Sequence, residues 1–409
     1  MLRIHSITIS SLRGIRQLEL NFPERCSILC GPNGIGKSTI LEAIAASLNP
    51  YQKGFSRMAD SATGRMTANF QVIPGKTLTS EVKVGALFSD EQMNTFSRFD
   101  GNQYENVANL IFIRVNRDVP YIRQQNIAAD PDFPTIKRQS YDSLIEGISL
   151  HSVKRWFSNR VMFEPHGGLS EFQQRNLALA KGIFLRFDST IDFDNVSPAT
   201  LDVILKTTKG KIPFEFLSSG FKSSVLLVLG IIKEIEERFS AQEIEVDKFD
   251  GLIMIDEIDV HLHPKWQSTI LEIIKSCFPN AQIIVTTHSP FVVQAALGNE
   301  VLALEEIEGN ESGNLKIRSL SASKFGFLGW TIEEILTDVM GLESTTSQRL
   351  RTAQDMFQQA IDLDDQIKAT REFDELEALL HPKSELRGLY RLQLASIGGR
   401  FEEKDEVSQ

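Results

Sequence analysis

Cysteine is scarce in this chain of 409 residues, which contains only Cys26, Cys30 and Cys277. Three cysteines make no paired disulfide framework, and their spacing matches no zinc or iron–sulfur motif. Cys30 and Cys277 lie within apolar runs, where a thiol is usually a small core residue. The cysteine content therefore excludes a disulfide-rich scaffold and favours reduced thiols in a cytosol.

Long apolar runs are also missing from the sequence. No stretch approaches the roughly 20 apolar residues that span a membrane. The first five residues lead directly into an alternating strand pattern, without the apolar region of a secretory signal. We therefore expect a cytoplasmic protein without a membrane partner.

Positive charge is in deficit. Lys and Arg number 43 against 54 Asp and Glu, which gives a formal net charge of -11. This balance argues against general adhesion to nucleic acid or to an anionic membrane. Any contact with DNA must be confined to a local basic patch.

The most specific motif is the stretch GPNGIGKST at residues 31–39. It matches the phosphate-loop pattern G-x-x-x-x-G-K-[ST] and lies between a strand-like run at 27–30 and a helix-like run at 38–47. Its glycines let successive backbone N–H groups face one anion-binding concavity. The helix N-terminus adds positive potential. The stretch therefore predicts a nucleoside triphosphate site.

Within this loop, Lys37 is expected to contact the β and γ phosphates, and the Ser38 hydroxyl is expected to ligate Mg²⁺. ATP and Mg²⁺ are therefore the expected cofactors. The predicted nucleotide-binding residues are Asn33, Gly34, Ile35, Gly36, Lys37, Ser38 and Thr39.

Two further apolar runs, 252–255 and 283–285, end in polar residues. Asp256 and Glu257 close the first run, so we expect Asp256 to hold Mg²⁺ with Ser38 and Glu257 to activate water. His288 follows the second run, where an imidazole can contact the γ phosphate. Because the carboxyl ends of parallel strands meet at one edge of a sheet, Glu257 and His288 are predicted to be catalytic residues of one site.

The residues Leu217-Ser218-Ser219-Gly220 open a long helix-like run from about 219 to 239. Hydroxyls and free N–H groups at a helix N-terminus form a second anion site. The same pattern in isolation is an ordinary helix cap.

These four motifs, taken in their order along the chain, resemble those of an ABC-type ATPase. The opening residues 7–14 and the stretch DEIDVHLHP at 256–264 are similar to the RecF, SMC and OLD-like branch of that class. The resemblance covers residues 2 to about 302, apart from an inserted region. It implies that two subunits sandwich ATP, so the chain is expected to form a dimer or a higher oligomer.

In such a dimer, Ser218, Ser219 and Gly220 would bind the neighbouring protomer's nucleotide in trans. The resemblance also implies that the turn at 259–263 lies at the subunit interface. A position in an interface turn fits His261 and His263 better than metal binding by the two imidazoles does.

The resemblance and the strand pattern together predict an α/β fold. Its ABC-type ATPase core has a mostly parallel sheet and N-terminal antiparallel strands. An inserted helical lid and a C-terminal helical interaction segment accompany the core. The expected boundaries are 1–127 and 195–326 for the core, 128–194 for the lid, 327–400 for the C-terminal segment and 401–409 for a disordered tail.

The family's Q-loop glutamine links an inserted lid to the γ phosphate. It is expected after the apolar run 110–114, where this chain has Val115-Asn116-Arg117. Only Gln124 or Gln125, further along, offers a match. Within the lid, helices are expected at 141–157 and 169–182, and the core strands are expected to resume at 201–214.

Residues 330–343 and 373–389 resemble the C-terminal part of ATPases from bacterial anti-phage systems of the Septu and retron-associated kind. The resemblance implies an ATP-hydrolysing switch or scaffold that controls an effector nuclease of the HNH type. A reverse transcriptase with a non-coding RNA is the other implied partner. A plain pair of packing helices remains the alternative for this segment.

A second functional hypothesis is a RecF-like DNA repair clamp that contacts DNA through the lid or through a partner. Scattered basic residues are otherwise typical of a solvated face. The ATPase subunit of a transporter fits less well, because the Q-loop lacks an assignment and the C-terminal addition is large. The basic candidates for a clamp are Arg114, Arg117, Arg123, Lys137, Arg138, Lys154, Arg155 and Arg160.

Overall fold

The chain forms two compact units, Met1–Gly341 and Leu342–Gln409. The division falls after Gly341, whereas the C-terminal segment was expected to begin at residue 327. Phe327, Ile335 and Val339 are buried in the core of the first unit. The computed structural model describes residues 1–49, 55–85, 103–115, 124, 127, 129–149, 152–307, 312–321 and 324–398.

A six-stranded sheet in the order β13-β12-β3-β11-β10-β6 is the centre of the first unit. All neighbouring strands pair in parallel except β13, which is antiparallel to β12. Apolar runs without alternation form these strands because both faces of a parallel sheet are covered. The strands are β3 (Cys26–Cys30), β6 (Leu110–Ile113), β10 (Leu252–Ile255), β11 (Gln282–Thr286), β12 (Val301–Glu306) and β13 (Leu315–Ile317).

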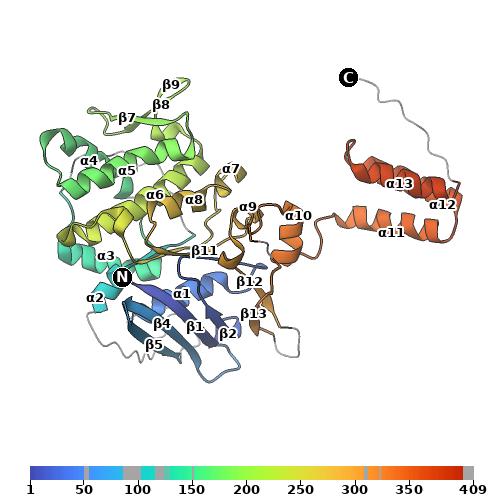
Figure 1. Cartoon of the computed structure of the whole chain (residues 1–409), viewed down its shortest axis with the longest axis horizontal. Coiled ribbons are helices and arrows are strands. Elements are labelled where there is room, and N and C mark those ends of the chain that lie inside the picture. The colour runs from blue at the N-terminus through green and yellow to red at the C-terminus, as the bar shows by residue number, and fades with distance from the viewer. Residues whose placement is uncertain are drawn as a thin grey trace. The chain divides into compact units, whose positions relative to one another are not determined.

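The two faces of this sheet contribute to two separate cores, because successive side chains of a strand point to opposite faces. On β10, Ile253 and Ile255 join the core that contains residues of α6 (Ser219–Arg238) and α8 (Ile270–Cys277). Met254 joins the core that contains residues of α1 (Lys37–Leu48). Figure 1 shows α6 and α8 on one side of the sheet and α1 on the other.

An antiparallel sheet in the order β2-β1-β4-β5 shares its core with α1. Alternating patterns such as that of β1, in which Ile7 and Ile9 are buried, fold this way because one face packs and the other meets water. The predicted α/β fold with N-terminal antiparallel strands is therefore confirmed. The strands are β1 (Arg3–Leu12), β2 (Ile15–Asn21), β4 (Gly64–Ile73) and β5 (Lys76–Val84).

Helices dominate the region predicted to be a lid, with different bounds from those expected. The helix expected at 141–157 is interrupted, because Gly147 ends α3 with a φ of 81°. The second expected helix extends further, to Phe187. The helices here are α3 (Phe133–Glu146), α4 (Val153–Phe163) and α5 (Glu171–Phe187), and α2 (Gln103–Ala108) precedes the region.

The strands expected at 201–214 are present, but they do not join the central sheet. They form β8 (Val203–Thr207) and β9 (Gly210–Pro213), which pair with β7 (Asp192–Val196) in a separate antiparallel sheet. A tight turn at Gly210, with a φ of 115°, keeps β8 and β9 together. β7 takes the other edge of β8, so both sides of that strand are occupied.

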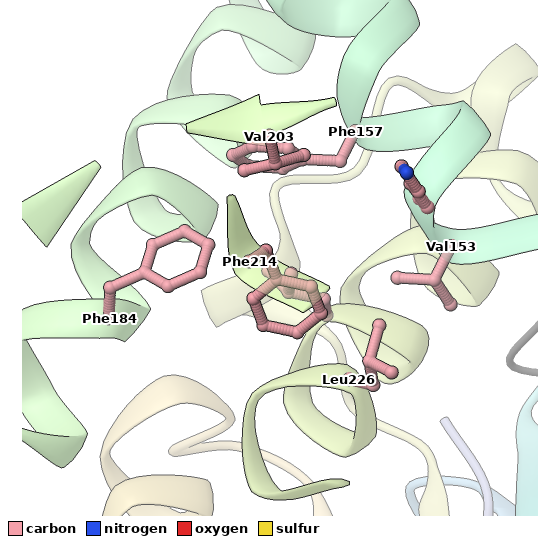
Figure 2. A pocket seen from close by; sticks show the side chains of 8 residues that line it. Val153, Phe157, Phe184, Val203, Phe214 and Leu226 are labelled. Carbon is pink, nitrogen blue, oxygen red and sulfur yellow. The ribbon is translucent and has the colours of Figure 1, made fainter. Parts of the chain in front are cut away.

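A small apolar cavity lies between this sheet and the helices around it. Figure 2 shows its lining, which comes from α4, α5, α6, β8 and the Phe214 turn. Lys154, the one charged residue of the lining, has its ammonium group paired with Asp202 and Glu215. We assign the cavity to packing between these elements.

The helices α7 (Pro264–Gln267) and α8 are separated at Ser268 and Thr269, whose hydroxyls donate hydrogen bonds to the carbonyl of Lys265. The remaining helices of the first unit are α9 (Pro290–Gln294), α10 (Ile332–Glu334) and the π-helical turn η7 (Ile335–Val339). The 3-10 turns are η2 (Glu164–His166), η3 (Phe214–Phe216), η4 (Ser240–Gln242), η5 (Val246–Lys248) and η6 (Gly298–Glu300).

The second unit contains α11 (Gln348–Asp362), α12 (Gln366–Leu379) and α13 (Glu385–Ser396). Phe357 and Phe373 are at the centre of its own small core. The tail expected at 401–409 lies outside the described residues. Within the part of the chain that the structure describes, no helix has the length and apolar character to cross a membrane.

Candidate active site

The phosphate loop connects β3 to α1 through glycines in left-handed conformations. The φ angles are 136° at Gly31, 79° at Gly34 and 100° at Gly36. A Cβ atom on Gly31 would lie 2.5 Å from the carbonyl oxygen of Leu304, and one on Gly36 would lie 2.9 Å from Ile15. Side chains are excluded at both positions, so the backbone itself forms the inner surface of the loop.

Lys37 is 5% exposed, and its ammonium group donates hydrogen bonds to the carbonyl oxygens of Gly31 and Pro32, at 2.9 and 3.0 Å. Burial lowers the pKa of Lys37, while the carboxylates of Glu257 and Asp256 act in the opposite direction. The charged amine therefore lies between the loop and the acidic ends of the neighbouring strands.

Ser38 and Asp256 lie together, as predicted from the sequence. The Ser38 hydroxyl donates to Asp256 Oδ1 at 3.0 Å. The same oxygen accepts from the Thr286 hydroxyl at 2.6 Å, and Thr286 Oγ1 in turn accepts the backbone N–H of Glu257 at 2.6 Å. One threonine side chain thus connects both candidate acidic residues.

Glu257 has a φ of 48°. This left-handed conformation is uncommon for a residue with a side chain and costs about 1–3 kcal/mol, so it persists only where the surroundings enforce it. Here the hydrogen bond to Thr286 and the bond from Ile258 N–H to the Thr286 carbonyl, at 2.9 Å, hold the turn. Such backbone strain is concentrated at functional sites.

Asp259 connects the turn that follows β10 to the segment that contains His288 through hydrogen bonds. Its Oδ1 accepts the Thr287 hydroxyl and, at 3.2 Å, the backbone N–H of His288. Burial lowers the pKa of His288, and the charge of Lys37 lowers it further. The imidazole is therefore biased toward its neutral form, which retains an acceptor nitrogen at neutral pH.

The residues Ser218, Ser219 and Gly220 form a second group, at the N-terminal end of α6. The Ser218 hydroxyl accepts the N–H of Phe221 at 3.4 Å, so it is a helix cap. Ser218 and Ser219 are exposed, whereas Gly220 is buried. A Cβ on Gly220 would lie 2.6 Å from the carbonyl oxygen of His261. The start of α6 therefore packs against the 259–263 turn of its own chain and presents the two serines outward.

Sequence reasoning assigned no role to Thr286, and it placed Asp259 only in a turn at the subunit interface. The parallel register pairs Ile255 with Val285, so the next residues, Asp256 and Thr286, lie side by side. The run TTHSP at 286–290 contains three hydroxyl side chains, but the sequence alone does not show which residues of neighbouring strands lie side by side. Only pairing between strands 30 residues apart reveals the contact.

Replacing Thr286 by valine is expected to lower ATP turnover and stability. Valine has the same shape, but it leaves the Glu257 N–H without its hydroxyl acceptor, and leaving a buried polar group unpaired costs about 1–3 kcal/mol. Steady-state ATPase assays and thermal melts measure the two effects. Thr286→Ser is the matched control and should retain both properties, and equal turnover of the valine variant would contradict the assignment.

No glutamine directly follows β6, where the Q-loop was expected. Gln125 lies outside the described residues, and Gln124 is described without its neighbours in the chain. The residue that directly follows β6 is Arg114, which pairs with Glu42 of α1.

The basic residues proposed for a DNA clamp are partly used within the protein. Arg160 binds Asp130 through two hydrogen bonds, of 3.0 and 2.8 Å, and also pairs with Glu236. Its side chain is 5% exposed. Arg114 and Lys154 are likewise in ion pairs, and Arg117 and Arg123 lie outside the described residues. These contacts weaken the case for a phosphate-tracking patch in the lid.

Metal binding is best supported at Ser38 and Asp256. A hydroxyl and a carboxylate at hydrogen-bonding distance are hard oxygen donors of the type that Mg²⁺ prefers. His263 Nδ1 instead accepts the N–H of Lys265, at 3.3 Å. Among the described residues, no group of three or more His, Cys, Asp and Glu side chains is arranged to hold a metal ion.

Comparison with known proteins gives a family match and a relative along nearly the whole chain. The family model described as "AAA domain, putative AbiEii toxin, Type IV TA system" matches residues 26–294. Septu protein PtuA of Bacillus thuringiensis is 36% identical over 401 residues, which is 97% of this chain and 99% of that protein.

The Retron Vc95 probable ATPase of Vibrio cholerae serotype O1 biovar El Tor is 25% identical over 344 residues. The match covers 80% of this chain and 63% of that protein. Among solved structures, an SMC head bound to the C-winged helix domain of ScpA aligns with 78% of this chain and 98% of its own, at 14% identity and a TM-score of 0.48.

Proposed function

The chain belongs to the family of AAA-domain ATPases that includes Septu protein PtuA, and on this premise we propose that it is the ATP-hydrolysing switch of an anti-phage defence complex. The observation that carries the proposal is the convergence of the phosphate loop with the ends of β10 and β11. There Ser38, Asp256 and Thr286 form a continuous hydrogen-bonded chain.

In the proposed reaction, the loop amides and Lys37 bind the phosphates of ATP. Glu257 accepts a proton from the attacking water, and His288 contacts the γ phosphate. Thr286 and Asp259 hold Glu257 and His288 in fixed positions relative to the phosphate loop. Preorganised groups of this kind lower the barrier because they do not have to reorient as charge develops.

Mg²⁺ fits the oxygen donors present and would be held by Ser38 and Asp256. When bound, the ion would neutralise charge on the β and γ phosphates. The hydrogen bond from Thr286 to Asp256 would orient the carboxylate for that role.

The exposed serines at the start of α6 support a composite site that a second protomer completes. Ser218 and Ser219 are available to a neighbouring nucleotide, while Gly220 lets α6 approach the 259–263 turn closely. ATP-dependent association would then control an effector nuclease of the HNH type, docked through the lid or the C-terminal helices. The names of the relatives, Septu and retron, favour this multi-component setting.

Lys37→Ala tests the proposed ATP site. The variant should weaken ATP binding by at least about tenfold, because a hydrogen bond to a charged group contributes about 1.5–3 kcal/mol. Titration calorimetry with ATP measures the loss, and Lys209→Ala, on the exposed β8–β9 turn, serves as the control. Equal affinity in the Lys37 variant and the wild type would contradict the assignment.

A further inference from the structure

Arg114, at the end of β6, contacts both the phosphate-loop helix and the lid. Its guanidinium forms an ion pair with Glu42 of α1 and donates a hydrogen bond to the carbonyl oxygen of Ile145 in α3. The carbonyl of the preceding residue, Ile113, accepts the backbone N–H of Asp256 at 2.8 Å. A single side chain therefore lies between the candidate active site, α1 and the lid.

Glu42 is the acidic centre of this junction. Its side chain is 8% exposed and pairs with Arg13, at the turn between β1 and β2, as well as with Arg114. A buried carboxylate is tolerated here because two guanidinium groups compensate it. Glu42 belongs to the same rigid helix as Lys37 and Ser38, so a shift of the phosphate-loop end of α1 also shifts the charge that holds Arg114.

The lid side of the junction is closely packed. A Cβ atom on Gly147, which ends α3, would lie 2.8 Å from Cγ of Arg114. The next residue, Ile148, donates its backbone N–H to the carbonyl of Phe112 in β6 at 2.9 Å. α3 also packs directly on α1. The end of α3 is therefore held by the same strand that carries Arg114.

The junction lies within the electrostatic reach of the candidate site. Burial lowers the pKa of Arg114, and the positive charge of the neighbouring Arg13 lowers it further. The Asp256 carboxylate raises the pKa and so acts in the opposite direction. Negative charge in the phosphate loop would attract both arginines, because charges in a partly buried setting are screened less than in water.

We propose that the Arg114–Glu42 pair is the joint through which nucleotide at the phosphate loop positions the lid. Arg114 is a positioning residue, acting through Glu42 on one side and Ile145 on the other. With ATP bound, the pair holds the end of α3 against α1. The inference rests on the proposed ATP binding and adds the route by which that binding reaches the lid.

Hydrogen–deuterium exchange on the full chain, with and without ATP, tests the joint. In the wild type, ATP should slow exchange in α3. In Arg114→Ala and Glu42→Gln the ATP-dependent protection should disappear, and kcat should fall about tenfold, a typical size for coupling between sites. KM for ATP should change little, because the phosphate contacts remain. Arg114→Lys, which keeps the charge but loses the guanidinium fork, should recover only part of the protection.

Lys154→Met is the matched control. It removes the ion pairs that connect α4 of the lid to Asp202 and Glu215, and it should leave the ATP response of α3 intact. Equal protection of α3 by ATP in the wild type and in both junction variants would overturn the proposed role of the Arg114–Glu42 pair, while the proposed ATP binding would stand. That role would also be overturned if α3 in those variants exchanged rapidly without ATP, since that would indicate local unfolding. A wild-type chain that bound no ATP would remove the proposed function and, with it, this inference.

Discussion

Glu257→Gln is expected to lower ATP turnover by about 10²–10⁴-fold, the usual contribution of a general base. The amide keeps the size of the carboxylate but cannot accept a proton from water. The hydrogen bond between the Glu257 backbone and Thr286 does not involve the side chain, so the strained turn should persist. ATP should therefore remain bound, and the nucleotide-associated state of the protein should accumulate.

Phosphate release measures the turnover of this variant, and size-exclusion chromatography with ATP measures the accumulation. Glu171→Gln, which makes the same chemical change at a side chain that is 92% exposed, is the control. Turnover of Glu257→Gln at the wild-type rate would show that another group activates the water. Loss of ATP binding would show instead that the carboxylate has a binding role.

The second large effect is the recovery of activity when two inactive chains are mixed. Lys37→Ala disables the phosphate loop, and Ser218→Arg places a bulky cation at the exposed start of α6. Each variant alone should be inactive in a composite dimer. A mixed dimer contains one site with both an intact loop and intact serines, so ATP hydrolysis should return.

Differently tagged chains allow the mixed dimer to be purified before its ATPase activity is measured. Ser347→Arg is a matched control, because Ser347 also caps a helix, accepting the N–H of Leu350 at 3.3 Å, but lies in the second unit. It should retain activity by itself. A verified mixed dimer without any ATPase activity would contradict the assignment of Ser218 to a neighbouring site.

The central strands and the phosphate loop were predictable from the sequence because their signals are local. Apolar runs that end in polar residues mark buried parallel strands, and the pattern of glycines at 31–39 defines a backbone shape within a few residues. Local signals also predicted the strands at 201–214, but not the sheet that they join. A strand pattern does not name its partner, and β8 pairs with β7 and β9 in a separate sheet.

What the sequence by itself determined is the set of candidate reactive groups and the α/β architecture that brings strand ends to one edge. The candidates are Lys37, Ser38, Asp256, Glu257 and His288. The tertiary structure alone decided how these groups are held: Thr286 between both acidic residues, Asp259 beneath His288, and Arg114 between α1 and the lid. Each of these contacts joins residues about 30 or more positions apart. Strand register and helix packing set such distances, and neither is encoded in any short stretch of the chain.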